Sequence, residues 1–219
     1  CLLGHKRQNV MQDAFLGPEF TNQTIRQFLI QRGIQFQEVD DQELAYFVAS
    51  QIAQSKLIGR FQGRMEFGPR ALGNRSILAH PGNPDMKEII NTRIKQREPF
   101  RPYAPAVLEE RAGEFFEAKQ FSPFMLLAAS VRKDKQALIP AVTHIDQSAR
   151  VQVVSRRLNP KFWGLIKEFE KLTGIPMLIN TSFNLRCEPI VCTPQDALGS
   201  FLQSKMDCLV LENCVILRQ

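Results

Sequence analysis

The stretch RMEFGPRALGNRSILA, residues 64–79, brings three arginines and two glycines together around a single glutamate. It approaches the phosphate-binding P-loop, in which a lysine directly follows the second of two glycines separated by four residues. Gly68 and Gly73 have this separation, but Asn74 stands where the lysine is required. The residues that follow have strand character, whereas a P-loop runs into a helix. We therefore reject the P-loop interpretation.

A different anion site remains compatible with this stretch. Its glycines predict a turn, which would place Arg70 and Arg75 beside a bend rich in backbone N–H groups. Arginine predominates among the bases of residues 60–101, and its planar guanidinium matches phosphate or carboxylate with two parallel hydrogen bonds. The alternative is a turn whose arginines pair with Glu66 and other carboxylates.

A second cationic stretch, KQREPFRPYAP at residues 95–105, supplies Lys95, Arg97 and Arg101. Its three prolines restrict the backbone, so the cations would lose little freedom on binding a ligand. This favours a built site over a flexible basic arm. The alternative, a helix C-terminus that carries cations, explains Lys95 well but Arg101 poorly.

Two further stretches could contribute to the same site. In THIDQSARVQ, residues 143–152, Arg150 begins an apolar strand and either enters a site or pairs with a carboxylate such as Asp146. In LINTSFN, residues 178–184, a buried strand leads to amide and hydroxyl side chains, and sheets of α/β proteins place ligand contacts at strand ends. Because side chains alternate along a strand, we expect Asn180 and Ser182 to point to the same side.

Other catalytic machinery is not visible in the sequence. It contains neither the G-x-S-x-G nor the H-E-x-x-H motif, and its five cysteines and three histidines suggest no metal site. His144 is interpreted as a hydrogen-bonded structural residue. The chain instead offers arginine, lysine, amide and hydroxyl groups, which suit phosphoryl or adenylyl chemistry by positioning and charge neutralisation.

The elements that must position these groups follow a mixed α/β pattern. Helical periodicity and capping residues predict helices at residues 21–33, 40–56, 83–95, 111–118, 159–174 and 193–205. Runs rich in Val, Leu and Ile predict strands at residues 57–63, 75–80, 102–110, 124–132, 150–155, 177–183 and 208–218. We find no repeat or linker, so we expect one domain, residues 1–219, with an N-terminal helical extension.

Composition limits the class of protein. The 219 residues are 44% apolar and carry a net charge of +6, which fits a globular protein that binds nucleic acid or phosphorylated ligands. No apolar run is long enough for a membrane span or a secretory signal, so we predict a cytoplasmic protein. Because the chain opens on a cysteine, we also expect it to be part of something longer.

From about Leu16 to its C-terminus, the chain resembles the C-terminal domain of the nodulation-protein and antibiotic O-carbamoyltransferases. The motifs that carry the resemblance are GRMEFGPRALGNRSILA, KQREPFRPYAP, THIDQSARVQ and TGIPMLINTSFNLRCEPIVCTPQDAL. It implies a YrdC-like α/β fold, a twisted mixed sheet flanked by helices, that binds carbamoyl phosphate and ATP with Mg²⁺ and forms carbamoyl-adenylate. A separate N-terminal domain of the ASKHA type, absent from this chain and carrying an iron-type metal, would then transfer the carbamoyl group to an acceptor hydroxyl.

The resemblance also implies roles for individual residues. Arg101 and Arg150 would hold carbamoyl phosphate, and Asn180 and Ser182 would orient its oxygens and carbonyl. The triphosphate of ATP would be neutralised by Arg70 and Lys95. Secondary candidates are Asn184 for the substrate and Arg75 and Arg97 for the nucleotide.

Two positions, Gln147 and Cys187, depart from the family pattern that the resemblance implies. Glycine is usual at both of these positions. If either position requires a positive φ, the loop must be rebuilt, with consequences for the placement of Arg150 or of the NTSFN donors.

Three alternatives remain open. The first is a basic RNA-binding module, although bases and aromatic residues do not alternate as a stacking platform requires. The second is a stand-alone threonylcarbamoyl-adenylate synthase, which would need a threonine and bicarbonate site. The third is a non-catalytic interaction domain, which the departures at Gln147 and Cys187 keep open.

Overall fold

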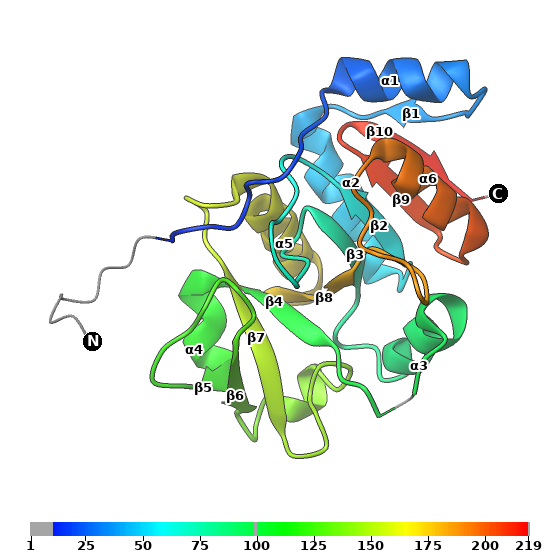
Figure 1. Cartoon of the computed structure of the whole chain (residues 1–219). Coiled ribbons are helices and arrows are strands. Elements are labelled where there is room, and N and C mark those ends of the chain that lie inside the picture. Colours follow the sequence, from blue (N-terminus) through cyan, green and yellow to red (C-terminus); the bar gives the residue numbers. More distant parts are fainter. Residues whose placement is uncertain (1–10, 99, 219) are drawn as a thin grey trace, which may run out of the picture.

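The computed structural model describes residues 11–98 and 100–218, which form a twisted mixed sheet of ten strands (Figure 1). The strand order is β1-β10-β9-β2-β3-β8-β4-β7-β6-β5. The strands are β1 Gln37–Glu38, β2 Ile58–Phe61, β3 Arg75–Ala79, β4 Ala104–Leu108, β5 Phe116–Glu117, β6 Leu127–Val131, β7 Ser148–Val154, β8 Met177–Ser182, β9 Cys208–Leu211 and β10 Cys214–Leu217.

Helices cover the sheet and its ends. They are α1 Asn22–Gln31, α2 Asp41–Ala53, α3 Met86–Ile90, α4 Ala112–Phe115, α5 Pro160–Thr173 and α6 Pro194–Gln203. Helices α2 and α5 pack against each other, α5 contacts β4 and β8, and α6 contacts β2 and β9. Figure 1 shows α1 along β1 and β10 at one end of the sheet and α4 beside β5 and β6 at the other. Among the described residues, no helix combines the length and apolarity needed to cross a bilayer.

Local sequence explains most helix boundaries. The side chains of Thr21 and Asp40 accept hydrogen bonds from the first turns of α1 and α2, and a capping box joins Thr193 and Asp196 at the start of α6. Gly174 ends α5 in the left-handed conformation, φ 75°, which glycine adopts without steric cost. These boundaries agree with the sequence-based expectation.

Three expected elements differ in the structure. The helix expected at residues 111–118 ends at Phe115, because the next two residues pair with β6 as strand β5. The strand expected at residues 208–218 is a hairpin that turns at Glu212, φ 48°, where the Glu212 carboxylate accepts from the Gly63 N–H and pairs with Lys161. The helix expected at residues 83–95 is α3 followed by a π-helical segment, Asn91–Lys95.

Candidate anion site

The centre of the site lies on β4 and its two neighbours. Asn180 on β8 pairs with Ala104 on β4, and on the other side Gln152 on β7 pairs with Ala106. Alternation along the strands therefore places Asn180, Gln152 and Arg150 on one face of the sheet. Arg150 and Asn180 stand two strand spacings apart, roughly 10 Å, with the small Ala104 side chain between them.

The structure brings Arg70, Arg97 and Arg150 together without a carboxylate. Among residues 11–98 and 100–218, none of these three arginines forms an ion pair. The Nε atoms of Arg70 and Arg150 are buried and have no hydrogen-bond partner. Burial, followed by repulsion from Arg70 and Arg97, lowers the pKa of Arg150. Three guanidinium groups in one place without an ion pair among the described residues make this a candidate anion site.

Arg97 is held in place for such a role. Its Nε donates to Asn91 Oδ1 at 3.3 Å, and its guanidinium carbon lies 4.5 Å from the centroid of the Tyr103 ring. The Tyr103 hydroxyl donates to the same Asn91 oxygen at 2.6 Å, which fixes the ring. Stacking and two hydrogen bonds, the second from Nη2 to Pro102 O at 3.5 Å, orient the Arg97 fork while leaving donors free for a ligand.

Lys95 ends the π-helical segment, and Gln96 after it is left-handed, φ 44°. The buried Lys95 Nζ lies within 3.2 Å of four oxygens: Ser182 O, Ser182 Oγ, Asn184 O and Asn184 Oδ1. Burial, and secondly repulsion from Arg97, lowers the pKa of Lys95 to about 7, while Glu188 acts in the opposite direction. The Lys95 charge therefore changes close to neutral pH.

The same contacts change the interpretation of Ser182 and Asn184. Ser182 Oγ donates to Asn184 Oδ1 at 2.7 Å, and the oxygens of both residues face the Lys95 ammonium. Side-chain oxygens used in this way position Lys95 and are not free to orient a substrate. We therefore assign Ser182 and Asn184 to Lys95 and not to direct contact with a ligand.

The bend in residues 66–75 differs from the sequence-based expectation. The Oε1 atom of the buried Glu66 accepts from the N–H groups of Leu72, Asn74 and Arg75 at 2.7, 2.6 and 3.3 Å. The bend does bind an oxyanion, but that oxyanion is the carboxylate of Glu66. Its N–H groups are consequently unavailable to a phosphate.

Arg75 belongs to the core and not to a nucleotide site. Its side chain is fully buried, and its Nη1 faces the carbonyls of Gln62, Gly63 and Asn74 at 3.3, 3.1 and 2.9 Å. The guanidinium carbon lies 3.5 Å from the centroid of the Phe61 ring. Because these contacts enclose the guanidinium, we leave Arg75 out of the anion site.

Side chains on the sheet hold the carbonyl groups of the same bend. Asn180 Nδ2 donates to Ala71 O at 3.2 Å, and Gln152 Nε2 donates to Leu72 O at 2.7 Å. Further along, Arg60 donates to Gly73 O, and a Cβ atom at Gly73 would lie 2.4 Å from the Phe162 ring. Glycine is therefore required at position 73, because the backbone approaches Phe162 closely. The bend that these hydrogen bonds hold also carries Arg70, which lies close enough to Arg150 to repel it.

Asn180 retains one free acceptor. Its Nδ2 also donates to Gln152 Oε1 at 2.7 Å, and these two acceptors fix the orientation of the amide. The Asn180 Oδ1 atom is buried, and no group among the described residues donates to it. A buried acceptor without a partner on this face of the sheet suits a ligand that carries an N–H or O–H group.

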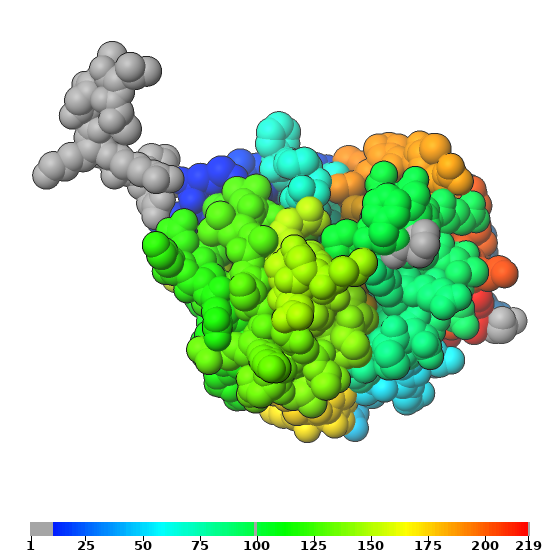
Figure 2. All heavy atoms as spheres, turned by 90° about the horizontal axis from the view of Figure 1, so that it is seen from below, coloured from blue at the N-terminus to red at the C-terminus, as the bar shows by residue number. Residues whose placement is uncertain are grey.

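Arg101 lies outside the cluster. Its side chain is 55% exposed and its Nε pairs with Glu98 Oε2 at 3.0 Å. Seen from below, the green segment around residues 95–101 and the yellow-green turn at residues 143–149 lie on one face of the molecule (Figure 2). Arg101 is thus an exposed residue that already has a carboxylate partner.

Sequence reasoning missed Gln152 and the internal role of Glu66. Gln152 stands two positions after Arg150 in an apolar strand, RVQVV, so alternation alone could have placed it on the same face. No comparable signal distinguished Glu66, because a glutamate in a loop is normally exposed.

Replacing Glu66 should destabilise the fold. Glu66→Ala leaves three N–H groups of a buried bend without their acceptor, so we expect the free energy of unfolding to fall by about 3 kcal/mol. Glu66→Gln retains the acceptor oxygen and should lose less. Urea denaturation of both variants measures the difference, and equal losses would contradict the assigned hydrogen bonds.

The two positions that depart from the family pattern both have a positive φ, 63° at Gln147 and 64° at Cys187. The backbone conformation is therefore the one that glycine favours, and the loops are formed with the larger residues in place. The turn keeps its hydrogen bonds, from Gln147 N to His144 O and from His144 N to Ser148 O, both at 2.9 Å. It leads directly into the strand that carries Arg150.

Replacing Gln147 with glycine should relieve this conformation. We expect Gln147→Gly to raise the free energy of unfolding by about 1 kcal/mol, because a left-handed residue other than glycine is strained by roughly that amount. Gln147→Ala, which keeps the Cβ atom, serves as the control and should give no gain. Urea midpoints measure both, and a loss of stability in Gln147→Gly would contradict the proposed strain.

Among the described residues, no group of three His, Cys, Asp or Glu side chains is arranged to hold a metal ion. Two cavities of the described structure lie away from the arginine cluster, one between α2 and α5 and one beside α6. We identify the candidate site by its charges and its unpaired hydrogen-bonding groups.

Comparisons with known proteins agree with the fold. The chain is similar to P. abyssi Sua5, solved in complex with L-threonine, with a TM-score of 0.59 at 14% identity over 81% of this chain and 48% of that one. It is also similar to full-length HypF in its phosphate- and nucleotide-bound form, with a TM-score of 0.56 at 18% identity over 80% of this chain and 26% of that one. These likenesses confirm the expected YrdC-like mixed α/β fold.

Sequence relatives identify the family. Nodulation protein NolNO of Sinorhizobium fredii is 46% identical over 94% of this chain and 31% of its own length, and nodulation protein NolO of Bradyrhizobium diazoefficiens is 43% identical over 92% and 37%. The chain therefore spans about a third of the length of these relatives. Residues 49–218 match the family model described as "Carbamoyltransferase C-terminus". The chain belongs to this carbamoyltransferase family and corresponds to its C-terminal part.

Proposed function

We propose that this chain is the domain of an O-carbamoyltransferase that binds carbamoyl phosphate and ATP and forms carbamoyl-adenylate. The observation that carries the proposal is the cluster formed by Arg70, Arg97 and Arg150, none of which forms an ion pair with a carboxylate among the described residues. Such a group is costly in the absence of an anion, since like charges repel and two of the arginines have buried, unpaired Nε atoms.

Arg70 and Arg150 would hold the phosphate of carbamoyl phosphate. The unpaired Asn180 Oδ1, on the same face as Arg150, would accept a hydrogen bond from the carbamoyl amine. An acceptor at this point distinguishes a carbamoyl group from an acetyl group, which has a methyl in place of the amine and would leave the oxygen without a partner. Asn180 therefore supplies selectivity and the arginines supply charge.

The nucleotide would lie toward Lys95 and Arg97, whose positive charges suit a triphosphate. Arg101 could join them by exchanging its surface partner Glu98 for a phosphate oxygen, because an exposed ion pair is worth little. The arginine cluster includes no carboxylate ligand for Mg²⁺, so the ion would bind through the phosphates of ATP. Bound Mg²⁺ would neutralise phosphate charge.

The reaction balances with one water molecule. Water takes the phosphoryl group of carbamoyl phosphate, and the carbamate so released attacks the α-phosphorus of ATP and displaces pyrophosphate. The contribution of this chain would be orientation and charge neutralisation, which need no side-chain nucleophile. Transfer to an acceptor hydroxyl would fall to the N-terminal domain that the greater length of the relatives makes plausible.

The test is a product assay on this chain with carbamoyl phosphate, Mg²⁺ and α-labelled ATP. We expect pyrophosphate, phosphate and a labelled carbamoyl-adenylate, all absent with Arg150→Ala. A parallel reaction contains threonine and bicarbonate in place of carbamoyl phosphate. Labelled product only in the parallel reaction would replace the proposal with threonylcarbamoyl-adenylate synthesis.

If neither reaction gives product, calorimetry with carbamoyl phosphate separates the two remaining cases. Saturable binding that Arg150→Ala abolishes would show a binding site that requires its partner domain for turnover. Absence of binding would contradict the proposed function. Salt-dependent binding of RNA by the same sample would then favour the nucleic-acid alternative.

A further inference from the structure

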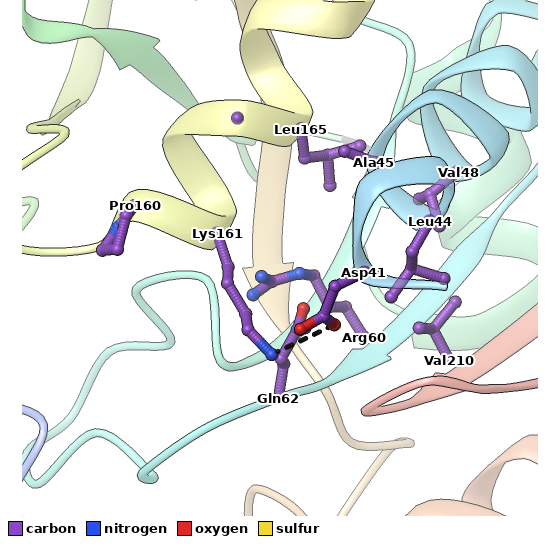
Figure 3. A pocket seen from close by; sticks show the side chains of 11 residues that line it. Asp41, Leu44, Ala45, Val48, Arg60, Gln62, Pro160, Lys161, Leu165 and Val210 are labelled. Carbon is purple, nitrogen blue, oxygen red and sulfur yellow. Dashed lines mark hydrogen bonds and ion pairs between the residues drawn. The ribbon is translucent and has the colours of Figure 1, made fainter. Parts of the chain in front are cut away.

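A second polar group faces a cavity elsewhere in the molecule. The cavity has a volume of about 280 Å³ and opens between α2 and α5 over the ends of β2 and β9 (Figure 3). Arg60 and Gln62 line it from β2 and the residue that follows, while Lys161 and Asp41 lie at the N-terminal ends of the two helices. None of these side chains belongs to the proposed carbamoyl phosphate site.

The inner end of the cavity contains hydrogen-bonding groups without partners. The Gln62 side chain is 5% exposed, and its amide makes no hydrogen bond to residues 11–98 or 100–218. Arg60 is 2% exposed and uses only Nη1, which donates to Gly73 O and Asn74 Oδ1. Within the same part of the chain, Arg60 has no carboxylate within ion-pair distance. These free groups face the cavity and are absent from the fully buried, unpaired atoms of the described residues, so a ligand in the cavity can reach them.

The remaining walls of the cavity are apolar. They are formed by Leu44, Ala45, Val48, Pro160, Leu165 and Val210. At the rim, Lys161 Nζ is shared by Asp41 and Glu212, each at 3.5 Å. The rim thus carries one cation and two carboxylates, and a positive charge lies deeper, at Arg60, which Glu212 attracts without forming an ion pair among the described residues. A matching ligand has a negative head and a short apolar tail.

We propose that this cavity binds a short-chain aliphatic carboxylate. The carboxylate would accept from Arg60 and from the Gln62 amide, and a tail of four or so carbons would contact Leu44, Val48 and Leu165. The volume lies just below the roughly 300 Å³ at which typical small-molecule sites begin, which excludes larger ligands. Two sources share this chemistry, a simple branched-chain acid and an aliphatic amino acid whose ammonium group could pair with Asp41.

The chain offers a variant that fills the cavity without removing its polar groups. Gly164 on α5 lines the cavity, and a Cβ atom there would meet nothing within 4 Å. Gly164→Leu should therefore fold and occupy the space of the tail. The matched control is Gly199→Leu on α6, where a Cβ atom also meets nothing within 4 Å but the side chain lies outside this cavity.

The experiment titrates ¹⁵N-labelled chain with isovalerate, isovaleramide or leucine and follows amide chemical shifts. We expect saturable shifts with isovalerate or leucine, affinity for isovaleramide at least tenfold weaker, and at least a tenfold loss in Gly164→Leu but not in Gly199→Leu. Tighter binding of leucine than of isovalerate identifies the amino-acid source, and the reverse identifies the simple acid.

Gln62→Leu provides a second, independent check, because it removes the amide without touching the clamp made by Arg60. Gln62→Leu should weaken binding of the carboxylate. Its affinity for isovaleramide should be no higher than that of the unaltered chain. Absence of saturable binding by both carboxylates, or equal affinity in the unaltered chain and Gly164→Leu, would overturn the proposal. Neither result bears on carbamoyl phosphate, so this inference stands or fails independently of the proposed function.

Discussion

Arg150→Ala should reduce the affinity for carbamoyl phosphate by about 10- to 100-fold. Arg150 is half-buried, its Nε atom has no hydrogen-bond partner, and Arg70 and Arg97 repel it. An anion would satisfy the unpaired donor and relieve the repulsion, and charged hydrogen bonds contribute about 1.5–3 kcal/mol each. Isothermal calorimetry with carbamoyl phosphate measures the loss directly.

The matched control is Arg156→Ala. Arg156 follows the same strand but is exposed and stacks 5.2 Å from the Trp163 ring centroid. It removes the same charge from the chain without entering the cluster, so affinity should remain within twofold. The assignment of Arg150 fails if the two variants bind equally well, because the effect would then reflect net charge alone.

The second large effect concerns Lys95 and pH. Its pKa is lowered to about 7, chiefly by burial. A bound anion stabilises the ammonium form of Lys95. The affinity for ATP, whose triphosphate we place near Lys95, should therefore fall about tenfold as pH rises from 6 to 8.5 and the free protein loses this charge. Calorimetry in buffers of different ionisation enthalpy should also show proton uptake on binding between pH 7 and 8.5.

Lys95→Met removes the titrating group. The variant therefore separates the effect of Lys95 titration from the effect of titration of the ligand itself. The variant should bind weakly at every pH, and any pH dependence that remains belongs to the phosphate, whose second pKa is about 6. Parallel affinity curves for Lys95→Met and the unaltered chain would contradict the assignment of Lys95 to the site.

The stability of the ligand-free chain should change with pH in the direction opposite to the affinity. The pKa of Lys95 is about 7 in the folded chain, against an ordinary value of 10.5. Between these values the unfolded chain binds more protons, so the free energy of unfolding should rise with pH across that window. Lys95→Met should show a smaller rise. The lowered pKa thus opposes folding at neutral pH, and a bound anion would compensate for it.

The sequence by itself determined most of the elements and supplied the candidate residues of the site. Capping residues and apolar periodicity located α1, α2, α5 and α6, and runs of branched residues located the central strands, because these signals are local. Arg70, Lys95, Arg97, Arg150 and Asn180 were selected from residue type and spacing. Clustered arginines stand out in a sequence because the planar guanidinium group matches phosphate and carboxylate.

Only the tertiary structure decided which of these groups are free to bind. Arg70 and Arg75 stand five positions apart in one motif, yet Arg75 donates to carbonyls and lies against the Phe61 ring, whereas Arg70 forms no ion pair among the described residues and lies close enough to Arg150 to repel it. Likewise, Glu66 neutralises the bend from within, and Ser182 and Asn184 face Lys95. The Lys95 pairings join residues 87 and 89 positions apart, and the Glu66 pairings, six to nine positions apart, depend on how the bend closes, so local patterns contain no record of either. A side chain's partners depend on which strands become neighbours, and only folding establishes that arrangement.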